Sequence, residues 1–238
     1  MHILGLVPAR GGSKGIARKN VRILGGKPLM QWTIEAALDA RTLTRIVVST
    51  EDEEIAAIAR SCGAAVPFIR PADLACDDTA TLPVVQHALR ALSKRGEQFD
   101  VVCLLQPTSP FRSASDIDHC VELLAASGAD SVVSVLRVPS EYNPHWVYFR
   151  ATDDSLTLST GGTEPIARRQ ILPAAFHRDG SVYVTRQDVI LRENSLYGKR
   201  VLGYEMTRAS AINIDTPADW DRAEAIMQEN GLATIETD

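Results

Sequence analysis

The sequence predicts an α/β fold built on a doubly wound, mostly parallel β-sheet. Short apolar runs alternate with longer segments whose apolar residues recur at helical spacing. In addition, 45% apolar and 23% charged residues in a chain of 238 residues match an ordinary globular domain with a substantial core. Strands and helices that alternate in this way form parallel sheets covered by helices on both faces.

The apolar runs are expected to be buried strands, because fully buried parallel strands are apolar along their whole length. Five of these runs lie within the first 135 residues, at 3–7, 45–49, 65–69, 101–105 and 131–135. Two further runs, 181–185 and 201–205, are expected to return to the same sheet.

The segments between the strands predict helices, because their apolar residues are spaced three and four positions apart. These segments are centred on residues 29–38, 55–59, 84–92, 117–124 and 218–228. Thr50 with Glu53 predicts a capping box at the start of the second helix. Thr216, followed by Pro217 and Asp219, predicts the same arrangement at the start of the last helix.

Residues 137–178 interrupt the alternation. They contain turn formers and the aromatic residues Tyr142, Trp146, Tyr148 and Phe149, but no long helical pattern. We interpret this stretch as an inserted hairpin arm within a single domain that spans residues 1–238. Apolar side chains on such an arm would form an exposed patch, and exposed apolar patches mark contacts. The arm is therefore expected to hold two copies of the chain together as a homodimer.

Charge and composition exclude several classes of function. The net charge of −5 argues against a nucleic-acid-binding protein, which needs a broad basic surface. No apolar run approaches the roughly 20 residues that span a bilayer, so no membrane association is expected. The four cysteines lie far apart and form no C-x-x-C pair, which favours incidental thiols in a cytoplasmic protein.

The loop after the first strand, residues 8–20, carries the strongest functional signal. It combines three glycines with four cations, namely Gly11, Gly12, Gly15, Arg10, Lys14, Arg18 and Lys19. Its spacing matches neither the P-loop nor the dinucleotide fingerprint. Ligands bind where strands end in open α/β sheets, and backbone donors with several cations suit a polyphosphate. The alternative is a solvated basic turn without a ligand.

The motif Arg10-Gly-Gly-Ser-Lys-Gly-Ile-x-x-Lys19-Asn20 resembles the N-terminal signature of the acylneuraminate cytidylyltransferases. Further matches follow in order: Ile46-Val-Val-Ser-Thr50, Arg70-Pro71, Leu74-Ala75, Leu104-Leu-Gln-Pro-Thr-Ser-Pro110, Arg169-Gln170, Gly180 and Ile212-x-Ile-Asp215. The likeness covers nearly the whole chain. It implies a Rossmann-like nucleotidyltransferase fold that uses Mg²⁺, CTP and an acidic nine-carbon sugar, and forms a CMP-sugar and pyrophosphate.

The resemblance also implies roles for individual residues. The catalytic cations that hold the triphosphate would be Arg10, Lys14 and Lys19. The other nucleotide-binding residues would be Gly11, Gly12, Ser13, Asn20, Arg70, Asp77 and Thr81. The sugar would meet Gln106, Arg169, Gln170 and Asp179, and the metal would meet Asp215 and Asn213.

The chain departs from the expected family pattern at two positions. Asn213 stands where the resemblance leads us to expect an aspartate, and Asp179 stands where it leads us to expect an asparagine. A carboxylate at position 179 would repel the sugar's carboxylate or meet an amino or hydroxyl group. This favours a bacterial nonulosonic acid of the legionaminic, pseudaminic or deaminated type over N-acetylneuraminate.

Two other functions stay open. The enzyme could use another nucleotide or another acidic sugar, since the basic loop mainly indicates phosphate binding. Alternatively, the chain could be a nucleotide-binding module without turnover. Asn213 favours that reading, whereas the intact basic loop and Asp215 argue against it.

Overall fold

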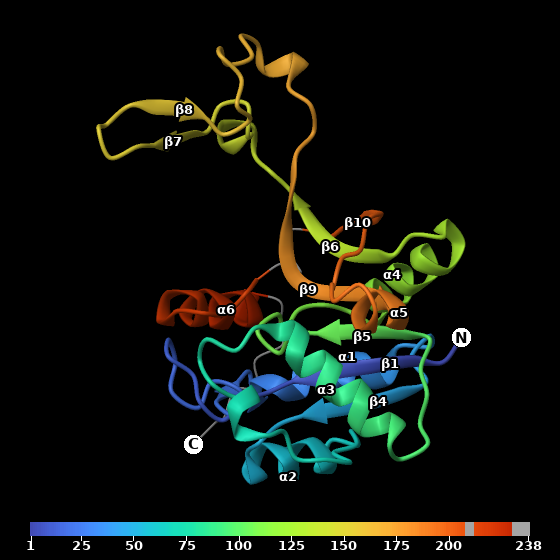
Figure 1. The fold of residues 1–238 in the computed structure, drawn as a ribbon. Coiled ribbons are helices and arrows are strands. Elements are labelled where there is room, and N and C mark those ends of the chain that lie inside the picture. The colour runs from blue at the N-terminus through green and yellow to red at the C-terminus, as the bar shows by residue number, and fades with distance from the viewer. Residues whose placement is uncertain (208–211, 230–238) are drawn as a thin grey trace.

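The computed structural model describes residues 1–207 and 212–229 of the chain. Its centre is a six-stranded sheet in the order β10-β6-β9-β5-β1-β4 (Figure 1). The strands are β1 (Ile3–Pro8), β4 (Arg45–Ser49), β5 (Val101–Leu105), β6 (Ser131–Arg137), β9 (Phe176–Arg186) and β10 (Val201–Glu205). Among these six, β9 runs antiparallel to its neighbours and the others are parallel. The predicted mostly parallel sheet is confirmed.

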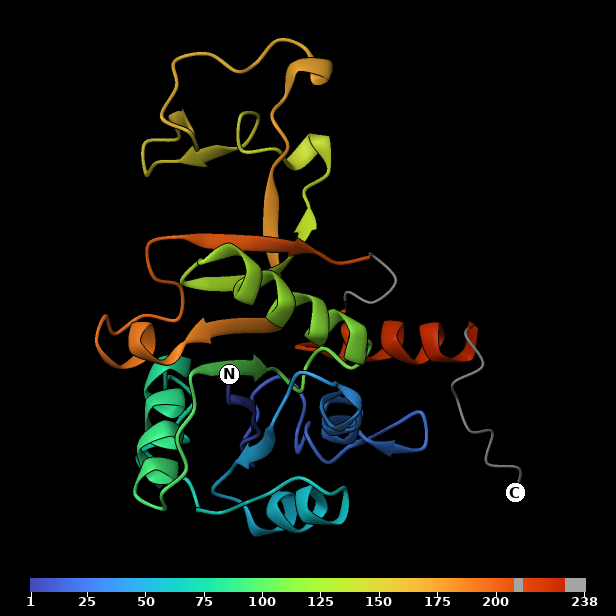
Figure 2. The same cartoon turned by 90° about the vertical axis from the view of Figure 1, so that its right-hand side faces the viewer.

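Helices cover both faces of the sheet, as predicted. They are α1 (Leu29–Asp39), α2 (Glu53–Ser61), α3 (Thr81–Ser93), α4 (Ala114–Ser127), α5 (Gln187–Leu191) and α6 (Pro217–Glu229). Side chains of β1 alternate between the faces. Ile3 and Val7 pack with α1, α2 and α4, whereas Leu4 and Leu6 pack with α3 and α5. Figure 2 shows α3 and α4 on different sides of the strands.

Two local predictions were wrong. The segment 65–69 is not a strand, because only Ala65 pairs with the sheet, as an isolated bridge to Val47. Helix α2 is capped by Asp52 and not by Thr50. The Asp52 carboxylate accepts a hydrogen bond from the backbone N–H of Ile55. Asp is as good a cap as Thr, and here it lies two residues closer to Ile55, the first apolar residue of the helix.

The cap predicted for the last helix is present. The backbone N–H of Asp219 donates to Thr216 Oγ1 at 3.3 Å, and the backbone N–H of Thr216 donates to the Asp219 carboxylate at 2.8 Å. A second capping box, between Ser113 and Asp116, starts α4. Helix α6 packs through Trp220 onto a separate apolar cluster that contains Ile16 and Ile214. The last helix therefore holds the basic loop against the segment before α6.

The chain between β6 and β9 leaves the sheet and projects from one side of the molecule (Figure 1). It contains the antiparallel pair β7 (Tyr148–Arg150) and β8 (Leu156–Leu158) and the short 3₁₀ helices η2 (Ser140–Tyr142) and η3 (Arg169–Ile171). A further small pair, β2 (Ile23–Leu24) and β3 (Lys27–Pro28), follows the basic loop, and η1 (Ala72–Leu74) precedes α3. Residues 208–211 and 230–238 of the domain expected over 1–238 lie outside the described part.

No helix within residues 1–207 and 212–229 is long and apolar enough to cross a membrane.

Candidate functional site

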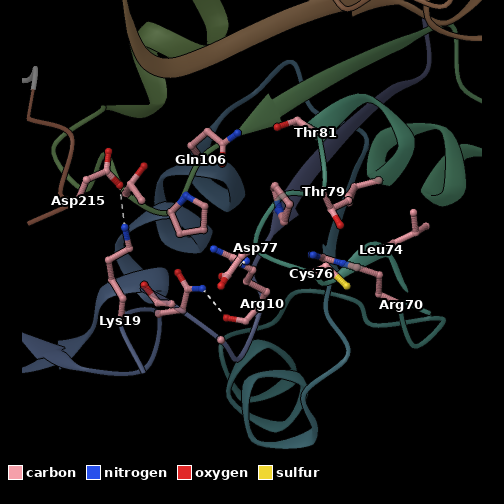
Figure 3. Close-up of a pocket in the computed structure, with 17 residues that line it drawn as sticks. Arg10, Lys19, Arg70, Leu74, Cys76, Asp77, Thr79, Thr81, Gln106 and Asp215 are labelled. Carbon is pink, nitrogen blue, oxygen red and sulfur yellow. Dashed lines mark hydrogen bonds and ion pairs between the residues drawn. The ribbon is translucent and has the colours of Figure 1, made fainter. Parts of the chain in front are cut away.

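A polar cavity of about 260 Å³ opens where β1 and β5 end (Figure 3). The carboxyl ends of these neighbouring parallel strands deliver the basic loop and Gln106 to the same place. The predicted residues that line the cavity are Arg10, Gly12, Ser13, Lys19, Asn20, Arg70, Asp77, Thr81, Gln106 and Asp215. The cations, hydroxyls and amides on these walls suit an anionic ligand with polar groups at several positions.

Lys19 and Asp215 form one end of the cavity (Figure 3). The Lys19 ammonium donates to Asp215 Oδ1 at 2.9 Å and to the backbone carbonyl of Ile214 at 2.6 Å. The Asn213 amide donates to Asp215 Oδ2 at 2.7 Å. Both carboxylate oxygens are thus held in place. Gly15 closes this contact, because a Cβ there would overlap with the backbone carbonyl of Asp215.

Asp77 joins two of the loop cations across the middle of the cavity. Its carboxylate lies 2.7 Å from Arg10 Nη1 and 3.4 Å from Lys14 Nζ. Lys14 is three-quarters exposed and does not belong to the cavity lining. The cations expected to hold a triphosphate therefore face a carboxylate of the chain itself.

The glycines of the loop differ in what they do. Gly12 lines the cavity, and a Cβ added there would meet no other atom within 4 Å. Gly11 does not line it, because its backbone N–H donates to Glu51 Oε1 at 2.7 Å. The predicted backbone donor of Gly11 is therefore already used within the protein.

Arg70 and Leu74 lie at the other end of the cavity, whereas Thr81 is on the side of Gln106 (Figure 3). Arg70 is buried and donates from Nε to Ser49 Oγ at 3.2 Å. Burial lowers the pKa of its guanidinium to about 10, with Glu51 opposing the shift and Arg10 adding to it. The group stays charged at neutral pH and adds positive potential to this end.

Arg18, the fourth cation of the loop, points away from the cavity. It forms ion pairs with Asp52 and Glu54 at the start of α2. Its φ of 52° lies in the left-handed region, and these contacts hold it there. Arg18 therefore fixes the loop to α2 and leaves phosphate binding to its neighbours.

The two departures from the expected pattern both lie next to Gly180. Asp179 precedes it in the sequence, and Asn213 lies close to it in space. Gly180 has a φ of 90°, and a Cβ there would be 3.8 Å from Asn213 Cγ. The Asp179 carboxylate does not line the cavity; it accepts hydrogen bonds from the hydroxyls of Ser134 and Ser181. The geometry gives no support to the idea that Asp179 selects the sugar by direct contact.

Arg169 and Gln170 lie on the arm, outside the cavity. Arg169 donates from Nε to Ser140 Oγ at 3.0 Å and lines a separate groove at the root of the arm. Within one chain, the structure does not bring these two residues to the cavity that Gln106, another predicted sugar-binding residue, lines.

Sequence reasoning missed several residues of the cavity. They are Pro8, Leu74, Cys76, Thr79, Val84, Pro107 and Thr108. Most of them are neighbours in sequence of residues that were predicted, in the segment before α3 and after β5. Proximity to a motif was the available signal, but single residues there carry no distinctive chemistry.

A metal ion bound beside Asn213 would find one carboxylate there, that of Asp215, since the Asp77 carboxylate pairs with Arg10 and Lys14. No group of three His, Cys, Asp or Glu side chains able to hold a metal occurs among the described residues. Asp215 is 60% exposed and lines the cavity, and Asn213 beside it offers an amide oxygen. Magnesium typically takes one or two carboxylates together with substrate phosphates and water, so Asp215 fits such an ion when a nucleotide is present.

Comparisons with known proteins agree on one family. A cytidylyltransferase family profile matches residues 4–237. The chain is 37% identical to the CMP-N,N'-diacetyllegionaminic acid synthase of Legionella pneumophila, over 99% of this chain and 100% of that one. It is 29% identical to the pseudaminic acid cytidylyltransferase of Campylobacter jejuni, over 97% and 98% of the two chains. A CMP:2-keto-3-deoxy-manno-octonic acid synthetase solved with CTP has a similar fold, with a TM-score of 0.72 at 17% identity, over 97% of this chain and 100% of that one.

Proposed function

The chain belongs to the cytidylyltransferase family, and we propose that it transfers CMP from CTP to a nonulosonic acid, giving a CMP-sugar and pyrophosphate. One observation carries this proposal. Residues far apart in the sequence, from Arg10 to Asp215, line a single cavity where β1 and β5 end. Relatives that match over nearly the full length of the chain are named for the same reaction on legionaminic and pseudaminic acids.

Nucleotidyl transfer places negative charge on the α-phosphate and on the leaving pyrophosphate. The protein's task is to position the reactants and to neutralise that charge. Arg10 and Lys19 face the cavity and can do so directly, whereas Lys14 at its rim can reach the outer phosphates. Arg70, Thr81 and Asn20 would then hold the cytidine part.

We place the sugar near Gln106, whose side chain lines the cavity beside Pro107 and Thr108. A sugar hydroxyl there would attack the α-phosphate and expel pyrophosphate. The bacterial nonulosonates are preferred as substrates because the relatives in Legionella and Campylobacter use them by name. This preference rests on the relatives and not on Asp179.

Mg²⁺ is proposed as the cofactor, with Asp215 as its protein ligand and Asn213 at its side. When bound, the ion would neutralise phosphate charge. The Lys19 ammonium already holds Asp215 Oδ1, so Lys19 orients this carboxylate toward the cavity. An Asp215→Ala variant should respond more weakly to added Mg²⁺, and an unchanged Mg²⁺ titration of activity would refute the assignment.

We also propose that the chain is a cytoplasmic homodimer held by the arm. Large apolar side chains on and beside the arm are strongly exposed, namely Tyr142, Tyr148, Phe149, Leu156, Ile171 and Phe176. Such a patch on a protruding segment is typical of a contact surface. A second copy would cover it, and Arg169 on the arm could then approach that copy's cavity. The four cysteines are free, which agrees with a reducing compartment.

The decisive experiment measures pyrophosphate release from CTP with a panel of nonulosonic acids, including the legionaminic and pseudaminic types. We expect turnover with at least one member and less with the other three nucleoside triphosphates. Turnover with another nucleotide or another acidic sugar would redirect the assignment. CTP binding without turnover across the panel would favour a nucleotide-binding module.

A further inference from the structure

Arg112 is a buried cation that the mechanism above does not use. It lies directly before α4, and only 3% of it is exposed. Burial lowers the pKa of its guanidinium to about 10, so the group remains charged at neutral pH. A buried charge is unfavourable unless other groups compensate for it, which makes its contacts informative.

The Arg112 guanidinium holds the turn that carries Gln106. Nη2 donates to the backbone carbonyl of Gln106, and the backbone N–H of Ser109 donates to the same carbonyl at 3.3 Å. Nε and Nη1 of Arg112 and Oγ of Ser109 are buried without a partner among the described residues. Arg112 therefore fixes the turn 106–109 through the hydrogen bond from Nη2 to the Gln106 carbonyl.

Asp179 supplies the nearby counter-charge. This carboxylate is 8% exposed and accepts hydrogen bonds from Ser134 Oγ, Ser181 Oγ and the backbone N–H of Ser181. Its charge acts on Arg112 through the protein interior without a direct ion pair, and the adjacent Gly180 approaches the turn, since a Cβ there would lie 3.9 Å from Ser109 Oγ. Asp179, which stands where the resemblance leads us to expect an asparagine, therefore compensates the buried positive charge of Arg112.

The turn 106–109 touches both the sugar side and the metal side of the cavity. Gln106 and Thr108 line the cavity. The Thr108 carbonyl accepts a hydrogen bond from the backbone N–H of Ile214 at 2.7 Å, and Asp215 follows immediately. A shift of this turn would move Gln106 and Asp215 together, while Arg70 lies at the other end of the cavity (Figure 3).

We propose that Arg112, balanced by Asp179, is a positioning residue that sets Gln106 and Asp215 for attack by the sugar. The proposal rests on the function proposed above. It predicts that Arg112 affects the acceptor and the metal more than the binding of CTP. A purely structural role would instead weaken folding and both substrates together.

The test compares Arg112→Gln with Arg112→Lys and with Arg186→Gln as a matched control. Arg186 also donates from a side-chain nitrogen to a backbone carbonyl, that of Ala129 at 2.8 Å. It pairs with Val101 at the start of β5, at the sheet edge opposite the cavity. We expect Arg112→Gln to lower kcat/KM for the acceptor about 100-fold, the usual effect of a small misplacement of reacting groups. The affinity for CTP, measured by calorimetry without acceptor, should stay unchanged.

A second readout does not depend on turnover. Amide hydrogen exchange at Ile214 should accelerate in Arg112→Gln and stay slow in Arg186→Gln, because only the first change loosens the Thr108 turn. Arg112→Lys should retain intermediate activity, since it keeps the charge but loses the fork of donors. In Arg112→Gln with Asp179→Asn, melting temperature should recover while activity does not.

Unchanged protection at Ile214 would overturn the proposal, as would equal losses for acceptor and CTP. If the unaltered protein turns over no acceptor, the proposed function fails, and exchange at Ile214 still decides the role of Arg112. If Arg112→Gln does not fold, Arg112→Lys carries both measurements.

Discussion

The ammonium of Lys19 lies 2.9 Å from the Asp215 carboxylate, although 196 positions separate the two residues in the sequence. This contact joins the loop after the first strand to the segment before the last helix. It places a cation expected to hold phosphate beside the carboxylate expected to hold a metal. Several properties of the protein should depend on this junction and on the residues around it.

Replacing Lys19 or Arg10 by alanine should lower turnover strongly without unfolding the protein. Loss of one preorganised charge-stabilising donor typically reduces kcat about 100- to 1,000-fold. Steady-state kinetics with CTP measures this effect, and circular dichroism checks the fold. Lys94→Ala, a cation at the end of α3 outside the cavity, is the control. Near-normal turnover of either loop variant would exclude that residue from the mechanism.

Gly15→Ala should open the junction between the loop and Asp215. The added Cβ would overlap with the Asp215 carbonyl, and overpacking of this kind costs about 1–3 kcal/mol. The free energy of unfolding should fall and CTP should bind more weakly. Gly12→Ala is a matched control, because a Cβ at that glycine meets nothing within 4 Å. Equal unfolding midpoints for the two variants would contradict the close packing at Gly15.

Asp77→Asn should tighten the binding of inorganic triphosphate in the absence of metal. The carboxylate that now pairs with Arg10 and Lys14 would be gone, so an incoming phosphate would no longer displace it. Partly exposed ion pairs contribute about 0.2–1 kcal/mol, which corresponds to a gain of at most about fivefold in affinity. Calorimetry on this variant and on Asp78→Asn, its sequence neighbour, tests the effect. Equal affinities would mean that Asp77 does not compete for these cations.

Acid should weaken the attachment of the basic loop to α2. The hydrogen bond from Arg18 lowers the pKa of Asp52 below its ordinary value, against an opposing effect of burial. Stability from this pair is therefore complete above about pH 4 and is lost as the pH falls through the lowered pKa. Urea unfolding of the native chain and of Asp52→Asn should differ at pH 7, and the difference should shrink as the pH falls below the ordinary pKa of an aspartate. A difference that does not shrink in acid would rule out this linkage.

Charged residues introduced on the apolar surface of the arm should prevent dimer formation. Ile171→Asp and Phe149→Asp alter side chains that are 65% and 67% exposed, so folding of one chain should be unaffected. We expect the native protein to sediment as a dimer and both variants as monomers. Ile69→Asp changes an exposed apolar residue outside the arm and should remain dimeric. A monomeric native protein at micromolar concentration would contradict the proposed homodimer.

The sheet could be predicted from the sequence because buried parallel strands are apolar along their whole length. Residues 45–49 and 101–105 are strands with the predicted bounds. Residues 65–69 are equally apolar, but they meet β4 only through Ala65, and apolarity alone does not reveal where a pairing partner is missing. The residue that caps α2 was harder to predict, because Thr50 and Asp52 are both good N-caps and lie only two residues apart.

The direction of single side chains could not be predicted. Arg18 and Lys19 are adjacent cations, yet the left-handed conformation of Arg18 sends it to α2 while Lys19 faces the cavity. Asp179 precedes a glycine that the sequence marks as important, but its carboxylate turns into the sheet toward Ser134. Such directions depend on contacts between segments far apart in the chain, which no local pattern encodes.

Strand β9 runs from the base of the arm into the middle of the sheet, from Phe176 to Arg186, and its register against β6 shifts at residues 179–182. Asp179 and Gly180 lie within it, a few residues from the point where it leaves the arm. Near the arm, residues 176–178 pair with β6 alone, whereas residues 183–185 in the sheet pair with both β6 and β5. A movement of the arm would therefore be felt first at Asp179 and at Gly180, which lies against Asn213, so the proposed dimer contact and the proposed metal site would be coupled.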